Sequence, residues 1–128
     1  WIFGLSCSTR PMSCFCHSKW RLISGSDVII SNPPYIKNNT KEIDNIVKKY
    51  EPSLALYGGD DGLKYYKEIL KTCKKNLNDK SIIALEIGYD LKEDIINIIK
   101  DYFKDSKIIC KKDYNDLDRY IFILNNLE

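Results

Sequence analysis

The stretch Asp27-Val28-Ile29-Ile30-Ser31-Asn32-Pro33-Pro34-Tyr35 decides how the rest of the chain is interpreted. Residues 27–31 are rich in β-branched apolar side chains, which predicts a buried strand. The two prolines that follow fix two φ angles at about −65° and remove two backbone N–H donors, so the chain leaves the sheet in a stiff, extended conformation. Ligands of open α/β sheets bind beyond the carboxyl ends of the strands. An amide, a proline-flanked carbonyl and an aromatic ring at such an end are suited to gripping a planar amide or amine.

The composition is that of one ordinary soluble domain. The chain has 128 residues, 44% of them hydrophobic and 30% charged, which suffices for a single core. No apolar run approaches the roughly 20 residues of a membrane-spanning helix, and residues 1–26 do not have the pattern of a signal peptide. The five cysteines show no disulfide-framework spacing, so we expect a reducing, cytoplasmic location and no membrane partner.

The charge is distributed unevenly along the chain. Of the 20 basic residues 17 lie after Asp27, whereas all 18 acidic residues lie at or after it, so residues 27–128 carry a formal charge of −1. A protein that grips duplex DNA normally presents a basic surface. This balance disfavours nucleic acid as a direct substrate.

Residues 1–26 form an atypical segment. They contain both tryptophans, the only methionine, the only histidine and no asparagine, whereas ten asparagines follow. We place a domain boundary at Gly25-Ser26 and expect residues 1–26 to be disordered or foreign to the domain at 27–128; the start at Trp1 indicates an incomplete translation product. No metal site is predicted, because the usual zinc-ligand spacing is missing from the four candidates Cys7, Cys14, Cys16 and His17.

Two amphipathic helices are predicted after the motif. The first follows Gly58-Gly59, with Asp60 or Asp61 placed to cap it, and ends at Asn78-Asp79. Its apolar stripe consists of Leu63, Tyr66, Ile69 or Leu70, Cys73 and Leu77. The second extends to about Phe103 and is introduced by the capping-box spacing of Asp90 and Glu93. Its apolar stripe consists of Leu91, Ile95, Ile98, Ile99, Tyr102 and Phe103. The lysine-rich residues 41–49 are predicted as a short helix or loop.

Three further strands are predicted over residues 81–87, 107–110 and 120–124. Glu86 interrupts the apolar run of the first, and its carboxylate either forms a structural hydrogen bond or faces the cleft; both interpretations stay open. The alternation of strands and helices predicts a parallel α/β sheet. The short link over 111–118 predicts an antiparallel pair at its end.

Further motifs accompany the tetrapeptide in order and spacing. They are Tyr50-Glu51-Pro52, Leu54-Ala55-Leu56, Gly58-Gly59-Asp60-Asp61-Gly62-Leu63, Tyr66 and Leu85-Glu86-Ile87-Gly88-Tyr89. Over about residues 27–122 the chain resembles the release factor glutamine methyltransferases of the HemK/PrmC type. The downstream motifs are the more specific part of this resemblance, because adenine methyltransferases of DNA share the tetrapeptide.

The resemblance implies an α/β fold. It corresponds to the second half of a seven-stranded Rossmann-like S-adenosylmethionine-dependent methyltransferase fold, from the fourth strand to a closing antiparallel strand pair. In such a fold the first half carries the glycine-rich loop that holds S-adenosylmethionine. No GxGxG sequence occurs in this chain.

The resemblance also implies a reaction and a site. The reaction is N5-methylation of the glutamine in a Gly-Gly-Gln segment of a peptide-chain release factor. The expected catalytic and substrate-binding residues are Asn32, Pro33, Pro34 and Tyr35. The Asn32 side chain and the Pro33 carbonyl would hydrogen-bond the glutamine amide, Tyr35 would pack against its plane, and Asn32 would also border S-adenosylmethionine. Without the cofactor loop and the amino-terminal helical domain, we expect the isolated chain to be inactive.

Two other classes of function remain as alternatives. An adenine-N6 methyltransferase of nucleic acid could use the same tetrapeptide, and methylation of an adenine-containing oligonucleotide but not of a release factor would favour it. A non-catalytic fragment or binding module is the second alternative. Its minimum requirement is cooperative unfolding of the bare chain.

Overall fold

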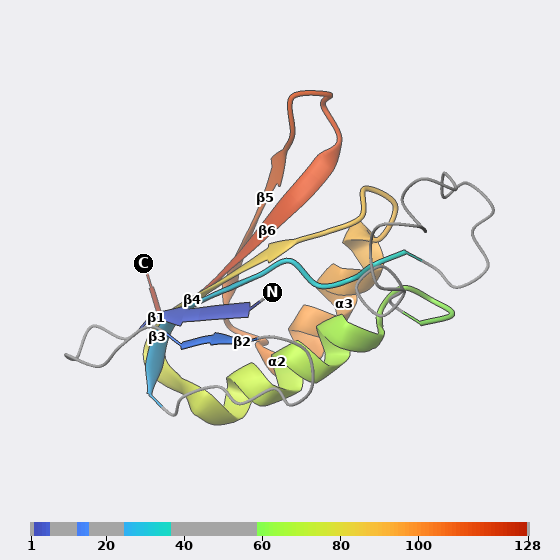
Figure 1. Cartoon of the computed structure of the whole chain (residues 1–128). Helices are drawn as coiled ribbons and strands as arrows, with labels where there is room; N and C mark the ends of the chain where they lie inside the picture. Colours follow the sequence, from blue (N-terminus) through green and yellow to red (C-terminus); the bar gives the residue numbers. More distant parts are fainter. Residues whose placement is uncertain (1, 6–12, 16–24, 37–58, 128) are drawn as a thin grey trace.

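The computed structural model describes residues 2–5, 13–15, 25–36 and 59–127, and for the first two ranges only the backbone. Six strands and two helices occur in these ranges (Figure 1). In chain order they are β1 (Ile2–Leu5), β2 (Ser13–Phe15), β3 (Ser26–Ser31), α2 (Lys64–Asn76), β4 (Leu77–Glu86), α3 (Lys92–Tyr102), β5 (Lys107–Lys112) and β6 (Asp118–Asn125).

The strands form one mixed sheet with the order β2-β1-β3-β4-β6-β5. Strands β3 and β4 are parallel, and α2 makes the crossover between them. Strand β6 lies antiparallel between β4 and β5. The parallel pair β3–β4 with its helical crossover and the antiparallel pair β5–β6 confirm the predicted α/β class, as expected for the second half of a Rossmann-like methyltransferase fold. The sheet as a whole is mixed rather than parallel, because β1 pairs antiparallel with β3 and β6 pairs antiparallel with β4.

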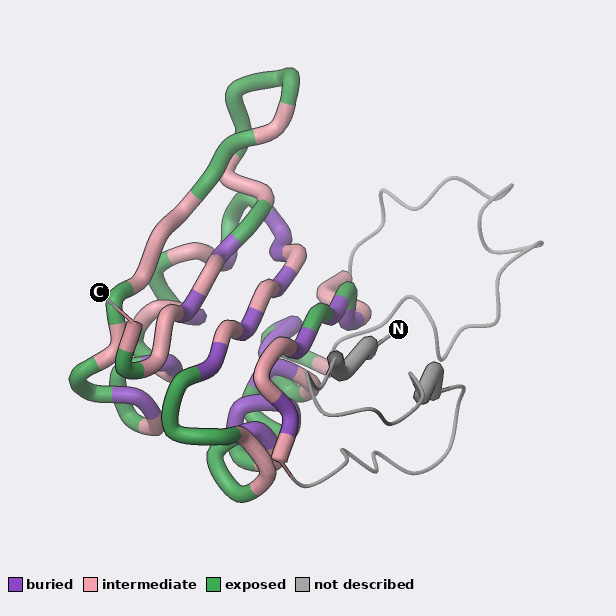
Figure 2. Tube along the Cα trace, turned by 90° about the vertical axis from the view of Figure 1, so that its left-hand side faces the viewer, coloured by how far each residue is buried: buried purple, intermediate pink, exposed green. Residues whose placement is uncertain are grey.

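Both helices lie on the same side of the sheet (Figure 1). Along the strands, residues that face these helices are buried and alternate with less buried ones (Figure 2). The predicted stripes of α2 and α3 supply the other half of this core, and both Ile69 and Leu70 are buried. The core consists of Ile29, Leu63, Tyr66, Ile69, Leu70, Cys73, Ile83, Leu85, Ile87, Leu91, Ile95, Ile99, Phe103, Ile121 and Ile123.

The junction between α2 and β4 differs from the prediction. The helix ends at Asn76, and Asn78 and Asp79 already belong to β4. Leu77 adopts an extended conformation and pairs with Ser26 at the start of β3. Pairing with β3 therefore ends the helix earlier than its apolar periodicity indicated.

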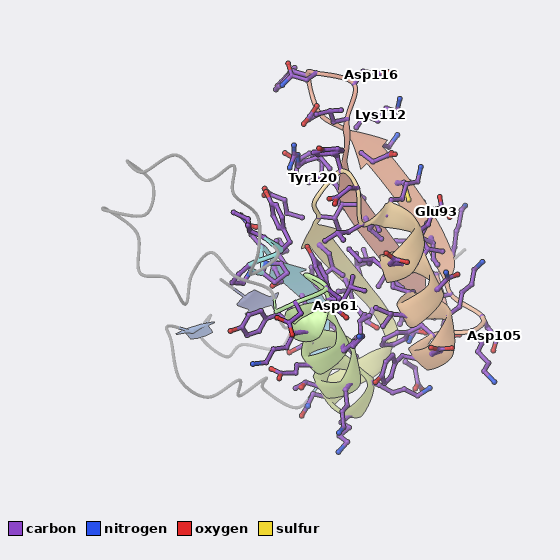
Figure 3. The ribbon with its side chains drawn as sticks, turned by 90° about the vertical axis from the view of Figure 1, so that its right-hand side faces the viewer. Asp61, Glu93, Asp105, Lys112, Asp116 and Tyr120 are labelled. Atoms are coloured by element: carbon purple, nitrogen blue, oxygen red, sulfur yellow. The ribbon has the colours of Figure 1, made fainter. Side chains whose placement is uncertain are left out.

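The predicted caps are only partly present. Asp61, at the amino end of α2 (Figure 3), accepts a hydrogen bond from the Leu63 backbone N–H at 2.9 Å and pairs with Lys67 at 3.0 Å. Leu91, not Asp90, occupies the cap position of α3, and the Leu91 side chain makes no cap bond; the capping box of Asp90 and Glu93 stays a prediction. The Leu91 backbone N–H donates to the Gly88 carbonyl at 3.0 Å. The turn at Gly88 thus introduces the helix.

Other predictions fall on residues outside the described ranges. Residues 41–49, the motifs over 50–56, Gly58, and the side chains of the candidate zinc ligands lie outside the described residues. Two short strands, β1 and β2, occur within residues 1–26, and β1 pairs antiparallel with β3. The origin of that segment stays a prediction. Among the described residues, no helix is long and apolar enough to cross a membrane.

Candidate active site

The Asn-Pro-Pro-Tyr motif begins directly after the last residue of β3. Ser31 pairs with Leu85 of the parallel β4, so the motif and Glu86 leave the sheet at the same edge. Asn32 is exposed, Pro33 is buried, and Pro34 and Tyr35 are half-buried. The predicted site residues therefore lie where two parallel strands end, with a polar amide at the surface and a rigid backbone beneath it.

The ring of Tyr35 packs against Gly88, which follows β4. A Cβ atom at Gly88 would lie 3.1 Å from Tyr35 Cδ2 and 3.2 Å from the Asp90 carboxylate. These distances are shorter than ordinary van der Waals contact, so the ring and the turn can approach this closely only because residue 88 has no side chain. Gly88 belongs to the motif Leu85 to Tyr89, and its contact with Tyr35 joins the two sequence signatures in space.

The phenol oxygen of Tyr35 accepts a hydrogen bond from Arg119 at the start of β6. The distance from Arg119 Nη1 to this oxygen is 3.3 Å, and the same nitrogen lies 3.4 Å from the Ile87 carbonyl oxygen. Arg119 also pairs through its backbone, because its carbonyl accepts from the Ile87 N–H at 2.8 Å. The sequence prediction did not include Arg119. No local signal marks it, since its contact with Tyr35 depends on β6 lying beside β4.

Asp113, in the turn between β5 and β6, holds the other side of the guanidinium. Arg119 Nε donates to Asp113 Oδ2 at 3.0 Å, and Asp113 Oδ1 accepts from the backbone N–H groups of Asn115 at 2.8 Å and Leu117 at 3.1 Å. Burial opposes ionisation of Asp113, but these donors outweigh it and lower the pKa of the carboxyl. Burial likewise opposes the charge of Arg119, and Asp113 and Tyr35 outweigh it and raise the pKa of the guanidinium.

Tyr66 of α2 is hydrogen-bonded to the end of β4 at the same edge of the sheet. Its hydroxyl donates to the Glu86 carbonyl at 2.8 Å, and its side chain is fully buried. Burial first, and then the neighbouring Tyr35 and Glu86, raises the pKa of the Tyr66 hydroxyl, so Tyr66 stays neutral. The half-buried Glu86 side chain acts electrostatically on both Tyr66 and Arg119. Tyr66 is therefore a structural support of the strand end, a role that its place in the predicted stripe did not reveal.

Within the part of the chain that the structure describes, no three His, Cys, Asp or Glu side chains converge on a point suited to a metal ion. The chemical resources at this edge are instead an exposed amide, proline-flanked carbonyls and an immobilised aromatic ring. Such groups can orient a planar substrate through hydrogen bonds and stacking.

Comparison with known proteins identifies relatives of one kind. The chain is 48% identical over 97 residues to the release factor glutamine methyltransferase of Clostridium botulinum, which covers 74% of this chain and 34% of that protein. It is 43% identical over 97 residues to the enzyme of Fusobacterium nucleatum, covering 74% and 27%, and 38% identical over 104 residues to that of Lactococcus lactis, covering 80% and 38%. The chain thus spans about a third of the length of the curated relatives that it matches.

A scan against protein-family models found no match. Among solved structures, the chain is similar to a release-factor-specific protein-(glutamine-N5) methyltransferase from Alicyclobacillus acidocaldarius, with a TM-score of 0.48 and 18% identity over 75% of this chain and 46% of that one. The sequence relatives carry the assignment: the chain belongs to the release factor glutamine methyltransferase family and matches a carboxyl-terminal part of its members.

Proposed function

We propose that the site at the end of β3 transfers a methyl group from S-adenosylmethionine to the side-chain nitrogen of glutamine in a Gly-Gly-Gln segment of a release factor. The observation that carries this proposal is the placement of Asn32-Pro33-Pro34-Tyr35 where two parallel strands end, with Tyr35 held by Gly88 and Arg119. The 48% identity to a release factor glutamine methyltransferase supports the same reaction.

The chemistry requires orientation more than it requires a base. An amide nitrogen is a poor nucleophile because its lone pair is delocalised into the carbonyl. The Asn32 side chain and the Pro33 carbonyl hydrogen-bond the substrate amide, and Tyr35 packs against its plane. These contacts orient the nitrogen towards the methyl group. As the new bond forms, the acceptor oxygens stabilise the positive charge that develops on the N–H groups.

S-adenosylmethionine supplies the electrophilic methyl group when bound. Of the residues that the structure describes at this edge, the exposed Asn32 amide fits a polar part of the cofactor, whereas the sequence contains no GxGxG loop. We therefore expect the 128-residue chain to bind the cofactor weakly and to be inactive by itself. A test of function must supply the remaining part of the enzyme.

A chimera provides that test. Residues 27–128 of this chain replace the matching part of the C. botulinum enzyme, and transfer of radioactive methyl groups from S-adenosylmethionine is measured with a release factor and with an adenine-containing oligonucleotide as acceptors. The proposal predicts labelling of the release factor by the chimera and none by the isolated chain. Labelling of the oligonucleotide alone would contradict the substrate, and activity of the isolated chain would contradict the expected dependence on the rest of the enzyme.

A further inference from the structure

Arg119 connects three parts of the molecule that are distant in sequence. Its Nη1 atom contacts the Tyr35 phenol oxygen at 3.3 Å and the Ile87 carbonyl oxygen at 3.4 Å, while its Nε atom contacts the Asp113 carboxylate at 3.0 Å. One guanidinium thus joins the motif after β3, the end of β4 and the turn between β5 and β6. Since Arg119 is the second residue of β6, which lies beside β4, the sheet topology itself brings it to the motif.

The guanidinium is itself held rigidly. The side chains of Arg119 and Asp113 are only 20% and 15% exposed, so water competes little for their charges. Asp113 cannot rotate freely, because its second oxygen accepts the two backbone N–H groups of Asn115 and Leu117. A fixed carboxylate therefore orients Nε, and the planar group then directs Nη1 at Tyr35.

We infer that Arg119 is a positioning residue for Tyr35, through which the β5–β6 turn fixes the aromatic wall of the methyl-transfer site. The part of this inference that concerns methyl transfer rests on the proposed function. Arg119 acts on the reaction through Tyr35: its hydrogen bond anchors the phenol end of the ring, while Gly88 limits the position of the ring edge.

Lysine cannot replace Arg119 in this role. A single ammonium group on a flexible stem does not present two fixed nitrogens in one plane, so it cannot contact Asp113 and Tyr35 in the geometry observed. Arg119→Lys keeps the charge and should still release the ring. This separates positioning from a general electrostatic effect.

The matched control is the neighbouring pair of Lys92 and Asp118, whose nitrogen–oxygen distance is 3.2 Å and whose side chains are 31% and 23% exposed. Lys92→Gln removes one positive charge close to the same sheet edge, as Arg119→Gln does. No contact of Lys92 with Tyr35 is observed among the described residues. A change in both variants would therefore reveal a charge effect alone.

The experiment is NMR on the full 128-residue chain with labelled tyrosine, phenylalanine, glycine and isoleucine. The close approach of Gly88 to Tyr35 predicts a nuclear Overhauser effect between a Gly88 Hα and a Tyr35 Hδ in the unmodified chain. We expect its loss in Arg119→Gln and Arg119→Lys and its retention in Lys92→Gln, with the methyl signals of Ile83 and Ile121 unchanged in all three. Retention of the effect in Arg119→Gln would overturn the inference.

A second variant decides the outcome if Arg119→Gln does not fold. Tyr35→Phe removes only the phenol oxygen, keeps the reporting ring and leaves Arg119 paired with Asp113, so it should weaken the same signal. An undiminished signal there would also overturn the inference.

Activity of the chimera separates this inference from the proposed function. Arg119→Gln should lower kcat about 10- to 100-fold, because a displaced ring misaligns the substrate, with little change in KM for S-adenosylmethionine. If the signal between Gly88 and Tyr35 is lost but the unmodified chimera transfers no methyl group, the proposed function fails and the positioning role stands. Unchanged kcat despite loss of the signal would show that the position of Tyr35 does not matter to transfer and would overturn the catalytic part of the inference.

Discussion

The helix-covered face of the sheet and its carboxyl-terminal edge are held by different interactions. The face is packed with buried aliphatic side chains such as Ile83 and Ile121, which lie beneath α2 and α3. The edge is held by a few directional contacts around Tyr35, with Arg119 on one side and Gly88 on the other. Changes to the face should therefore act on the free energy of unfolding, whereas changes to the edge should act on the geometry of the motif.

The largest effect is expected from truncating the packed face. Ile83 is fully buried, so Ile83→Ala should lower the free energy of unfolding by about 2–5 kcal/mol. Ile30 on the neighbouring β3 is 45% exposed, and Ile30→Ala should cost less than about 1 kcal/mol. Urea unfolding of the two variants measures both values. Equal losses would show that the two faces of the sheet are not packed differently.

Adding a methyl group at the edge should cost less than emptying the core. In Gly88→Ala the new Cβ meets Tyr35 and Asp90 at 3.1 and 3.2 Å, which should destabilise the protein by about 1–3 kcal/mol. The cost should shrink when Tyr35 is already alanine, because the double variant removes one of the colliding groups. A cost that is the same in both backgrounds would mean that the ring does not press on Gly88.

The buried Cys73 thiol should make the stability of the core depend on pH in alkaline solution. Burial raises the pKa of the Cys73 thiol from 9.0 to about 12. The folded protein keeps this proton where the unfolded chain loses it, so the stabilisation is complete below about pH 9 and is lost progressively towards pH 12. Between pH 8 and 10 the unmodified chain should lose about 1.4 kcal/mol more than Cys73→Ala, measured by urea unfolding under reducing conditions. If the free energy of unfolding fell equally in the two proteins, the Cys73 thiol would be exposed to water rather than buried.

The smallest effect is expected at Ser31, immediately before the motif. Ser31 is 2% exposed, and its hydroxyl has no hydrogen-bond partner among the described residues. Ser31→Ala should therefore be neutral or stabilise the protein by up to about 1 kcal/mol. Ser81, equally buried on β4, receives a hydrogen bond from Asn125 at 3.5 Å, and Ser81→Ala should be slightly destabilising. Thermal unfolding of both variants gives the comparison, and a clear loss of stability in Ser31→Ala would point to a partner that the hydroxyl contacts.

Local patterns were sufficient to predict most of the fold. The apolar stripe predicted from Leu63 to Cys73 does face the sheet, because an amphipathic helix is stabilised in the fold by burying its apolar face. The stiff exit from β3 follows from two prolines and needs no distant contact. The start of α3 was predicted less closely: the residue spacing indicated Asp90 as the cap, whereas Leu91 occupies the cap position and donates its N–H to the Gly88 carbonyl, a turn that residue spacing does not reveal.

The support of the site could not be predicted in the same way. Tyr35 and Arg119 are 84 positions apart and meet only because β6 lies between β4 and β5 rather than at the edge of the sheet. Chain order alone would place β5 beside β4. From the sequence alone, Arg119 therefore cannot be distinguished from any other charged residue near the start of a strand.

We propose that the exposed Asn32 amide at the end of β3 orients the substrate glutamine for methyl transfer, and this role is central to the proposed function. The most direct measurement is release factor methylation by the chimera carrying Asn32→Ala, with Asn97→Ala, at an exposed asparagine on α3, as the control. The account predicts that Asn32→Ala abolishes transfer while its unfolding curve stays unchanged, and that Asn97→Ala alters neither. Undiminished transfer by a folded Asn32→Ala chimera would contradict the account.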